Sequence, residues 1–384
     1  MQQAGGPSAL RLRQVSSIAQ VSAGAWDALF DPAYPFAQHA FLHALESAGC
    51  VGGRTGWSPC HLLAEDSSGR LVGAAPLYLK THSFGEFVFD WAWAEAAGRS
   101  YYPKLVCAIP FSPVAGPRLG AADDAVRNLL AAALARMPGE AGASSTHALF
   151  LRETELAPLL QHGLIERRDL QFHWHNAGYA RFDALLATLR ADKRKKIQRE
   201  RRRVAEAGIR FEVRSGDELG EADWHEIYAL YANTYEERGQ PPYLTPDFFL
   251  DYGRRAGTPL RLIVALEGQR RVAAAITLVG GDTLYGRHWG AAEHYHSLHF
   301  ETCYYQGIEF CIEQGLAHFD AGAQGEHKLA RGFVPQLTHS AHRLRDPRLH
   351  AAVETHLRRE RAWVESRRLQ LEGHAPFKDA HLDG

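Results

Sequence analysis

The sequence predicts a mixed α/β fold in which one structural unit occurs twice. Residues 61–79 and 261–279 each show an apolar strand, a polar turn with a glycine, and a second strand. The letters VGAA at 72–75 and VAAA at 272–275 stand 200 positions apart. Similar strand and helix patterns surround both hairpins. Two copies of one unit are the simplest account; the alternative is that any two short apolar hairpins look alike.

The patterns around each hairpin give the expected elements. For the first copy they are a strand at 10–15, helices at 22–30 and 38–48, an aromatic strand at 87–93, a helix at 123–137 and a strand at 147–151. For the second copy they are a strand at 209–213, helices at 222–238 and 246–255, a strand at 284–289, a helix at 300–314 ended by Gly315, and a strand at 318–320. The predicted division is an N-terminal domain at 1–190, a basic linker helix at 191–208, a C-terminal domain at 209–345, and a terminal helix and tail at 346–384.

The composition is that of a globular protein. Among 384 residues, 43 Lys plus Arg balance 44 Asp plus Glu, and 46% of positions are hydrophobic, which excludes disordered, collagen and coiled-coil classes. Five scattered cysteines without a CxxC pair argue against a disulfide scaffold or a structural zinc site. No stretch approaches the roughly 18 apolar residues of a membrane helix. We therefore expect a cytoplasmic protein without a membrane span.

Two long segments carry a family resemblance. The order of elements is that of GNAT-type acyltransferases, and the segments YYPKLVCAIPFSPVAGPRL at 101–119 and LHFETCYYQGIEFCIEQGLAHFDAGAQGEHKLARGFVPQLTHSAH at 298–342 resemble the FemAB-like predicted N-acyltransferases. The similarity runs from about residue 10 to 345. These proteins are relatives of the Fem aminoacyl transferases of peptidoglycan synthesis. The resemblance implies tandem GNAT-like domains that transfer an activated aminoacyl or acyl group to an amine.

Acyl transfer needs a neutral amine, a place for negative charge on the carbonyl oxygen, and a proton donor for the leaving group. A GNAT-like sheet provides these groups where two parallel strands part, here expected at 284–289 and 318–320. The carboxyl ends of these strands carry the candidate residues Arg287, His288, Trp289, Gln324, Glu326, His327 and Lys328.

Three of these residues are assigned to catalysis. By resemblance, Lys328 falls where Fem enzymes keep a lysine on the donor or substrate side, and a cation there can stabilise an oxyanion or bind a phosphate. The alternative for Lys328 is a solvated surface lysine. Glu326 and His327 are the expected proton carriers. Tyr304 lies on a helix whose one face is core and whose other face can line the cleft, so it joins the substrate-binding set.

The loop at 101–119 supplies further substrate-binding candidates. It combines aromatic, proline and cationic residues, a mixture typical of binding clefts, and Tyr101, Lys104 and Arg118 are its candidates. The alternative is that its prolines only stiffen a crossover.

Between residues 193 and 203, eight of eleven positions are Lys or Arg. If the donor is an aminoacyl-tRNA, RNA phosphates would bind here, through Lys195, Lys196, Arg201 and Arg202. A solvated linker helix is the alternative.

No tightly bound cofactor and no metal are expected. RHWGAA at 287–292 matches the letters of a coenzyme A signature, but HYHSLH separates it from the next helix. The spacing of His294, His296, His299 and Glu301 is not a recognised zinc pattern. Acyl-coenzyme A or an aminoacyl-tRNA is expected only as the donor substrate.

The sequence thus predicts an N-acyltransferase that passes an aminoacyl or acyl group to an amine, with a cell-wall precursor as a candidate acceptor. The expected partners are a small-molecule amine and, as a second candidate, tRNA. One alternative is a non-catalytic peptidoglycan or nucleotide recognition protein on the same fold. Another is an RNA-binding protein that depends on the basic helix.

Overall fold

The computed structural model describes residues 10–323 and 325–378, and the chain forms two compact units. Unit 1 comprises the chain up to Asp169 together with Thr338–Trp363; unit 2 comprises Leu170–Leu337 and the chain from Val364. Strand β9 (Ile165–His175), strand β15 (Val334–Leu344) and helix α12 (Pro347–Glu372) therefore each begin in one unit and end in the other. Both units are discontinuous in sequence, and the four continuous ranges predicted above stay a prediction.

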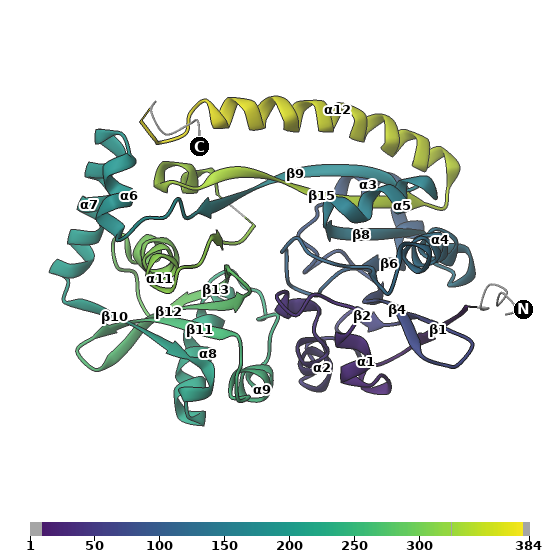
Figure 1. Cartoon of the computed structure of the whole chain (residues 1–384), viewed down its shortest axis with the longest axis horizontal. Helices are drawn as coiled ribbons and strands as arrows, with labels where there is room; N and C mark the ends of the chain where they lie inside the picture. The colour runs from purple at the N-terminus through teal and green to yellow at the C-terminus, as the bar shows by residue number, and fades with distance from the viewer. Residues whose placement is uncertain (1–9, 324, 379–384) are drawn as a thin grey trace, which may run out of the picture. The chain divides into compact units, whose positions relative to one another are not determined.

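Unit 1 contains two sheets, with strand orders β1-β3-β4-β7 and β15-β8-β6-β5-β2 (Figure 1). Its other strands are β1 (Arg11–Val15), β2 (Trp57–Pro59), β3 (His61–Glu65), β4 (Leu71–Ala75), β5 (Leu77–Lys80), β6 (Lys104–Cys107), β7 (Gly120–Ala121) and β8 (Ser145–Leu151). Its helices are α1 (Ala23–Asp27), α2 (His39–Ser47), α3 (Trp91–Ala97), α4 (Asp124–Glu140) and α5 (Leu156–Gln161), with 3-10 turns at η1 (Ile18–Gln20), η2 (Pro35–Ala37), η3 (Gly98–Tyr101) and η4 (Glu153–Glu155).

Helix α4 forms the core of unit 1 with the first sheet. Asp123 caps its first turn by accepting a hydrogen bond from Val126 N at 2.8 Å. Its apolar face, with Val126 and Leu130, packs on β4, where Gly73 leaves room: a Cβ at that position would lie 2.5 Å from Val126 Cγ1. The glycine therefore fixes the close approach of helix and sheet.

Unit 2 is one sheet with the strand order β10-β11-β12-β13-β14-β9 (Figure 1). Its strands are β10 (Ile209–Ser215), β11 (Leu260–Glu267), β12 (Arg270–Gly280), β13 (Thr283–Ala291) and β14 (His318–Asp320). Its helices are α6 (Phe182–Thr188), α7 (Ala191–Glu206), α8 (Glu221–Glu236), α9 (Pro246–Phe248), α10 (Leu298–Phe300) and α11 (Gln306–Gln314), joined by π-helical turns η6 (Phe249–Gly253) and η7 (Glu301–Tyr305) and by 3-10 turns η5 (Gly216–Glu218) and η8 (Glu326–Arg331).

The two units repeat the same local pairing. Hairpins β3–β4 and β11–β12 are both antiparallel, with a register shift at Ala64/Glu65 in one and at Ala265/Leu266 in the other. A parallel pair follows in each unit, β6–β8 and β13–β14. An antiparallel strand then joins from the other end of the chain, β15 on β8 and β9 on β14. This shared order supports an internal duplication.

The aromatic strand predicted at 87–93 is wrong. Residues 91–97 form α3, and the strand beside β5 is β6, inside the segment predicted as a loop. The alternating pattern misleads because Glu86 and Asp90 turn inward to bind the buried Lys104, at 2.8 Å for Glu86. The helix predicted at 300–314 is present, but a π-helical turn at Glu301–Tyr305 interrupts it before it ends at Gly315 with φ 67°.

Gly290, in the RHWGAA segment, has a packing role. A Cβ on this residue of β13 would lie 1.8 Å from the backbone oxygen of Leu230 in α8. The glycine therefore allows the helix and strand backbones to approach each other. This packing alone explains why position 290 is a glycine, so no phosphate ligand is needed to explain it.

We predict that Gly290→Ala destabilises the protein by ~3 kcal/mol or more, because neither backbone can yield without breaking its own element. The free energy of unfolding in urea measures the effect. Gly139→Ala is the matched control: nothing lies within 4 Å of its Cβ and it sits inside α4, so a gain of ~0.5–1 kcal/mol is expected. Equal stability of both variants would contradict the packing role.

Candidate functional site

The site in unit 2 begins where strands β13 and β14 part. They pair in parallel only at Thr283–Tyr285 and His318–Asp320, as the sequence predicted for this strand pair. Beyond that point α8 supplies hydrogen bonds to β13: Thr234 Oγ1 donates to the carbonyl of Trp289 at 2.8 Å, and Asn233 Nδ2 to that of Ala291 at 2.7 Å. Side chains of α8 thus accept the role of β14 there, because they donate hydrogen bonds to β13 carbonyl groups that β14 does not reach.

Lys328 lies at this opening and is 1% exposed. Its Nζ donates to the carbonyl of Gly322 at 2.5 Å, and the N–H of Gly322 donates to Asp320 Oδ1 at 2.9 Å. Burial lowers the pKa of Lys328 to about 8, with the Asp320 carboxylate opposing the shift. The alternative of a solvated surface lysine is therefore wrong, because the ammonium is held in a desolvated loop.

Aromatic and imidazole rings stand beside Lys328. Its Nζ lies 5.9 Å from the centre of the Tyr304 ring, and the Tyr304 hydroxyl lies 3.0 Å from Nε2 of His327. Burial together with the cations of Arg331, Lys328 and Lys196 lowers the pKa of His327, so the ring is neutral at pH 7. Burial raises the pKa of Tyr304, which keeps its hydroxyl protonated. A proton donor and a proton acceptor thus share one hydrogen bond.

Two buried carboxylates in this unit keep one oxygen each without a hydrogen bond from any described residue. They are Oδ2 of Asp320, which lies 3.7 Å from Nε2 of His173, and Oε2 of Glu301. The other oxygen of Glu301 accepts from Arg201 at 3.1 Å and from Gln306 at 2.8 Å. An unpaired buried carboxylate oxygen is costly, and such groups are concentrated at functional sites.

A buried ion pair ties the basic helix to the segment that carries Lys328. Arg331, at the end of η8, donates to Glu200 of α7 at 2.9 Å, and its Nε donates to the Tyr305 hydroxyl at 2.9 Å. The Tyr305 hydroxyl also donates to Glu200. The Arg331 guanidinium lies 3.6 Å from the centre of the Phe300 ring. Helix α7 is therefore anchored beside the site.

The remaining unit 2 candidates fall into different surroundings. Arg287 contributes to the lowered pKa of Lys328, and the Trp289 ring contacts His299, which in turn contacts Tyr304. His288 packs its ring against Tyr231 of α8 instead. Glu326 has a side chain that is 57% exposed and binds Arg367 through both oxygens at 2.7 Å. Gln324 lies outside the described residues.

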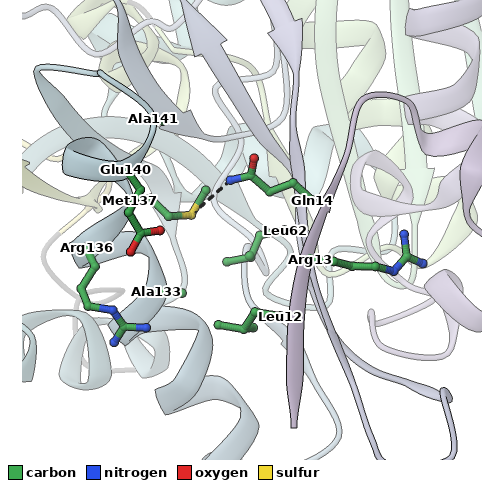
Figure 2. A pocket seen from close by; sticks show the side chains of 9 residues that line it. All are labelled: Leu12, Arg13, Gln14, Leu62, Ala133, Arg136, Met137, Glu140 and Ala141. Atoms are coloured by element: carbon green, nitrogen blue, oxygen red, sulfur yellow. Dashed lines mark hydrogen bonds between the residues drawn. The ribbon is translucent and has the colours of Figure 1, made fainter.

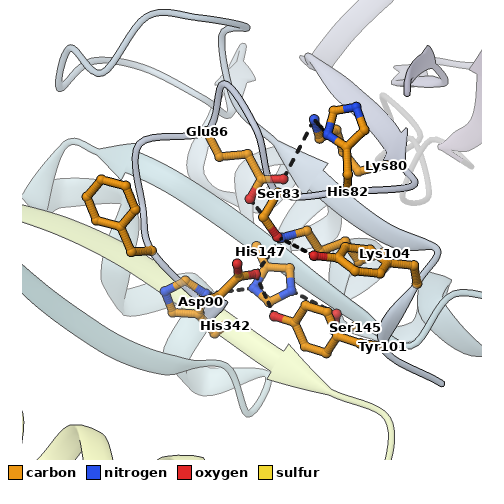
Figure 3. Close-up of polar contacts among 12 residues, drawn as sticks. Lys80, His82, Ser83, Glu86, Asp90, Tyr101, Lys104, Ser145, His147 and His342 are labelled. Carbon is orange, nitrogen blue, oxygen red and sulfur yellow. Dashed lines mark hydrogen bonds and ion pairs between the residues drawn. The ribbon is translucent and has the colours of Figure 1, made fainter. Parts of the chain in front are cut away.

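The three unit 1 candidates are buried and engaged internally. Lys104 binds Ser83, Glu86 and Asp90, while the Tyr101 hydroxyl donates to Asp90 at 2.6 Å (Figure 3). Arg118 is fully buried and donates to the carbonyls of Leu149, Pro117 and Val114 and to the hydroxyl of Tyr34. As substrate-binding residues all three stay a prediction.

The basic helix presents most of its charge to solvent. Lys195, Lys196 and Arg202 are exposed. Arg201 instead binds Glu301 and Glu309, and its guanidinium stacks over the Phe182 ring at 4.4 Å. Three of the four residues proposed for RNA are therefore available to a ligand.

A hollow of about 320 Å³ lies in unit 1 between β1 and α4 (Figure 2). Leu12 and Leu62 of the sheet face Ala133 and Met137 of the helix across it, and Arg136 and Glu140 stand at its rim. None of the residues proposed for catalysis line it.

The histidine-rich segment does not gather its side chains. His296 bonds Ser297 and Arg203, His299 contacts the rings of Trp289 and Tyr304, and Glu301 binds Arg201. Across residues 10–323 and 325–378 no group of three or more His, Cys, Asp or Glu is placed to hold a metal ion.

Sequence reasoning missed the Arg331–Glu200–Tyr305 contact and the role of the Gly322 carbonyl. Glu200 is one acid within a basic run and gives no periodic signal of burial. Every residue has a backbone carbonyl, so the sequence does not indicate which one accepts a hydrogen bond from Lys328.

Comparisons with known proteins agree with this architecture. The family of FemAB-like proteins, described as peptidoglycan biosynthesis/recognition, matches residues 17–379. No curated protein matches the sequence. FemX superposes with a TM-score of 0.52 and 11% identity over 87% of this chain and 98% of its own.

Two further solved structures are similar. One is the C-terminal domain of a protein named as a lysylphosphatidylglycerol synthetase from Agrobacterium fabrum, with a TM-score of 0.55 and 11% identity over 89% of this chain and 97% of that domain. The other is L-PGS from Bacillus licheniformis, with a TM-score of 0.50 and 11% identity over 81% of this chain and 94% of its own. The predicted mixed α/β fold, with the same strand pairing in each of its two units, is confirmed. In the part of the chain that the structure describes, no helix is long and apolar enough to cross a membrane.

We predict that Lys104→Met lowers the free energy of unfolding by ~3–5 kcal/mol, because it leaves the Glu86 and Asp90 carboxylates buried without their cation. Urea denaturation measures the loss. Lys378→Met is the control, since Lys378 is exposed and its ammonium donates to the carbonyl of Ala187 without a carboxylate partner among the described residues. An unchanged stability with a raised KM would instead support substrate binding by Lys104.

Proposed function

Because the chain belongs to the FemAB-like family, we propose that it is an N-acyltransferase that moves an aminoacyl or acyl group from an activated donor to an amine. The proposed acceptor is a precursor of peptidoglycan, in line with the description of the family. The observation that carries this proposal is the buried ammonium of Lys328 at the point where β13 and β14 part.

Lys328 supplies the charge that the reaction needs. As the acceptor nitrogen bonds to the carbonyl carbon, negative charge grows on the carbonyl oxygen, and the C–O or C–S bond to the leaving group then breaks. An ammonium has three N–H donors, and the Gly322 carbonyl accepts one of them. In a desolvated site the others stabilise the oxyanion more strongly than water would.

His327 and Tyr304 move the protons. His327 is neutral at pH 7 and can take a proton from the attacking amine, while Tyr304 keeps its hydroxyl proton and can donate to the leaving group. Since His327 and Tyr304 share a hydrogen bond, the pair gains one proton from the amine and gives one proton to the leaving group. We prefer this pair over Glu326, whose carboxylate is occupied by Arg367.

Asp320 is suited to hold an amine. Its Oδ2 is buried, accepts no hydrogen bond from the described residues, and lies in the same loop as Lys328. An ammonium on an aminoacyl donor would fill this acceptor.

The position of α7 supports one donor over the other. Lys196 is close enough to lower the pKa of His327, so the exposed basic face of α7 adjoins the proposed site. An aminoacyl-tRNA would place phosphates on this face and its ester near Lys328. We therefore propose an aminoacyl-tRNA donor over acyl-coenzyme A.

The alternative function is recognition without chemistry, which the family description also includes. Both functions predict ligand binding, and turnover of a charged donor separates them.

We predict that Lys328→Met reduces the rate of transfer by at least ~100-fold, because one oxyanion-stabilising group is lost. The same substitution removes the donor to the Gly322 carbonyl and the cation beside the buried Asp320 carboxylate, so the free energy of unfolding should also fall while the protein stays folded. Single-turnover transfer and urea denaturation measure the two effects. The control is Lys378→Met, expected to transfer at the unaltered rate. Full activity of Lys328→Met would show that Lys328 does not stabilise the oxyanion.

The pH dependence tests the charge of Lys328. With a pKa of about 8 the ammonium is lost as pH rises through that value, so kcat should fall on the alkaline side. Lys328→Arg should move this fall to higher pH, since arginine stays protonated above pH 12. A profile of kcat against pH measures both enzymes, and a fall at the same pH in both would show that another group titrates.

We predict that replacing Lys195, Lys196 and Arg202 by Gln weakens tRNA binding. The slope of log K against log salt should decrease by about 0.7–0.9 for each phosphate that the variant no longer neutralises. Filter binding across a salt series measures it. The matched control replaces the exposed Arg210, Arg254 and Arg255 by Gln and removes the same charge from the same unit. Identical slopes in all three proteins would rule out an RNA donor bound at α7.

A further inference from the structure

Three large aromatic side chains stand exposed on one short segment of unit 1. Phe84 and Phe89 are each 54% exposed and Trp91 is 45% exposed. The rings of Phe84 and Trp91 contact each other, with centroids 5.4 Å apart, so part of the group is a continuous apolar surface. Clustered exposed aromatic residues mark an interaction site, whereas single ones do not.

The segment that carries these rings is held rigidly from beneath. Lys80 Nζ donates to the carbonyl of Phe84 at 2.9 Å, and Arg167 donates to the carbonyl of Phe89 at 2.7 Å. Lys80 is buried and Arg167 is half-buried, so two cations fix the backbone next to two exposed rings.

The polar side chains of the same segment point the other way. Ser83, Glu86 and Asp90 are buried and bind Lys104, as Figure 3 shows. Aromatic residues therefore face outward and ionic residues inward along 83–91. Since burying charged groups is costly, this arrangement keeps a defined loop shape at the expense of stability.

The inward polar groups decide which ligand the surface fits. A sugar ring on an aromatic platform needs carboxylates or amides nearby for its hydroxyl groups, but Glu86 and Asp90 are turned away and bound to Lys104. Outside remain the apolar faces of Phe and Trp, the residue types that settle at the boundary between lipid headgroups and acyl chains, together with the exposed Glu95 of α3, a single carboxylate against the arginines described next.

Two exposed arginines lie on backbone segments that adjoin the one that carries the rings. Arg54 and Arg99 are exposed, and the backbone next to each is tied to the segment. The carbonyl of Thr55, the residue after Arg54, accepts a hydrogen bond from His82 at 2.9 Å, and the His82 ring contacts Phe84. Arg99 follows α3, which begins at Trp91. Arginines beside inserted aromatic rings are complementary to anionic headgroups.

We propose that Phe84, Phe89 and Trp91 form a docking surface for the interface of an anionic lipid bilayer, displayed by the buried ionic frame beneath them. Docking places the protein at a membrane surface without a spanning segment. It is independent of the acyl-transfer proposal, because it uses no residue of the Lys328 site.

The test is co-sedimentation of the full chain with vesicles of phosphatidylcholine alone and of phosphatidylcholine with about 30% phosphatidylglycerol, an anionic lipid that attracts basic side chains. We expect binding to the anionic vesicles, about tenfold weaker after Phe84→Ser, Phe89→Ser or Trp91→Ser and below detection in the triple variant, because each ring loses its burial in lipid. Lipids brominated on the acyl chain should quench the fluorescence of the wild type more than that of Trp91→Phe.

The matched controls are Leu160→Ser and Val213→Ser, exposed apolar residues at 38% and 37% outside the segment, which should bind vesicles like the wild type. Thermal melting checks that the triple variant is folded. Failure of the wild type to bind either vesicle would overturn the proposal, as would binding that survives the triple substitution. Self-association that the triple substitution abolishes, without vesicle binding, would make this a protein interface instead.

Discussion

The parting of β13 and β14 after three residue pairs is the constraint on which the proposed site depends. Parallel strands that stayed paired would close the opening with their own hydrogen bonds. Here Thr234 and Asn233 of α8 take over the carbonyls of Trp289 and Ala291, and Gly290 lets the helix come close enough to do so. The loop after β14 is then free to fold back, and Lys328 closes it through the Gly322 carbonyl.

Buried lysines serve two different purposes in this protein. Lys104 is surrounded by two carboxylates and a hydroxyl, so its charge is neutralised and it holds a loop in shape. Lys328 donates to one carbonyl, and burial lowers its pKa to about 8, so its charge is only partly compensated. A cation of the second kind is able to respond to a new negative charge, which is the basis of the proposed chemistry.

The two proposals also share a physical pattern. In unit 2 the anchored helix α7 turns Glu200 inward to Arg331 and leaves Lys195 and Lys196 outside; in unit 1 the segment at 83–91 turns Glu86 and Asp90 inward and leaves three aromatic rings outside. In both cases internal ion pairs fix the backbone whose outer face is proposed to bind a ligand. Rigid presentation of this kind reduces the entropy lost on binding.

The sequence by itself determined the periodic and local features: the duplicated hairpins, the strand pair at 284–289 and 318–320, the helix end at Gly315, and the basic helix. These follow from short-range patterns of polarity and turn residues. Only the tertiary structure decided that 87–93 is not a strand, that Arg118 and Lys104 are enclosed in a core, and that Lys328 and Tyr304 lie side by side while Glu326 faces Arg367. The physical reason is that the partner of a charged side chain lies far away in sequence, so its burial cannot be read from its neighbours.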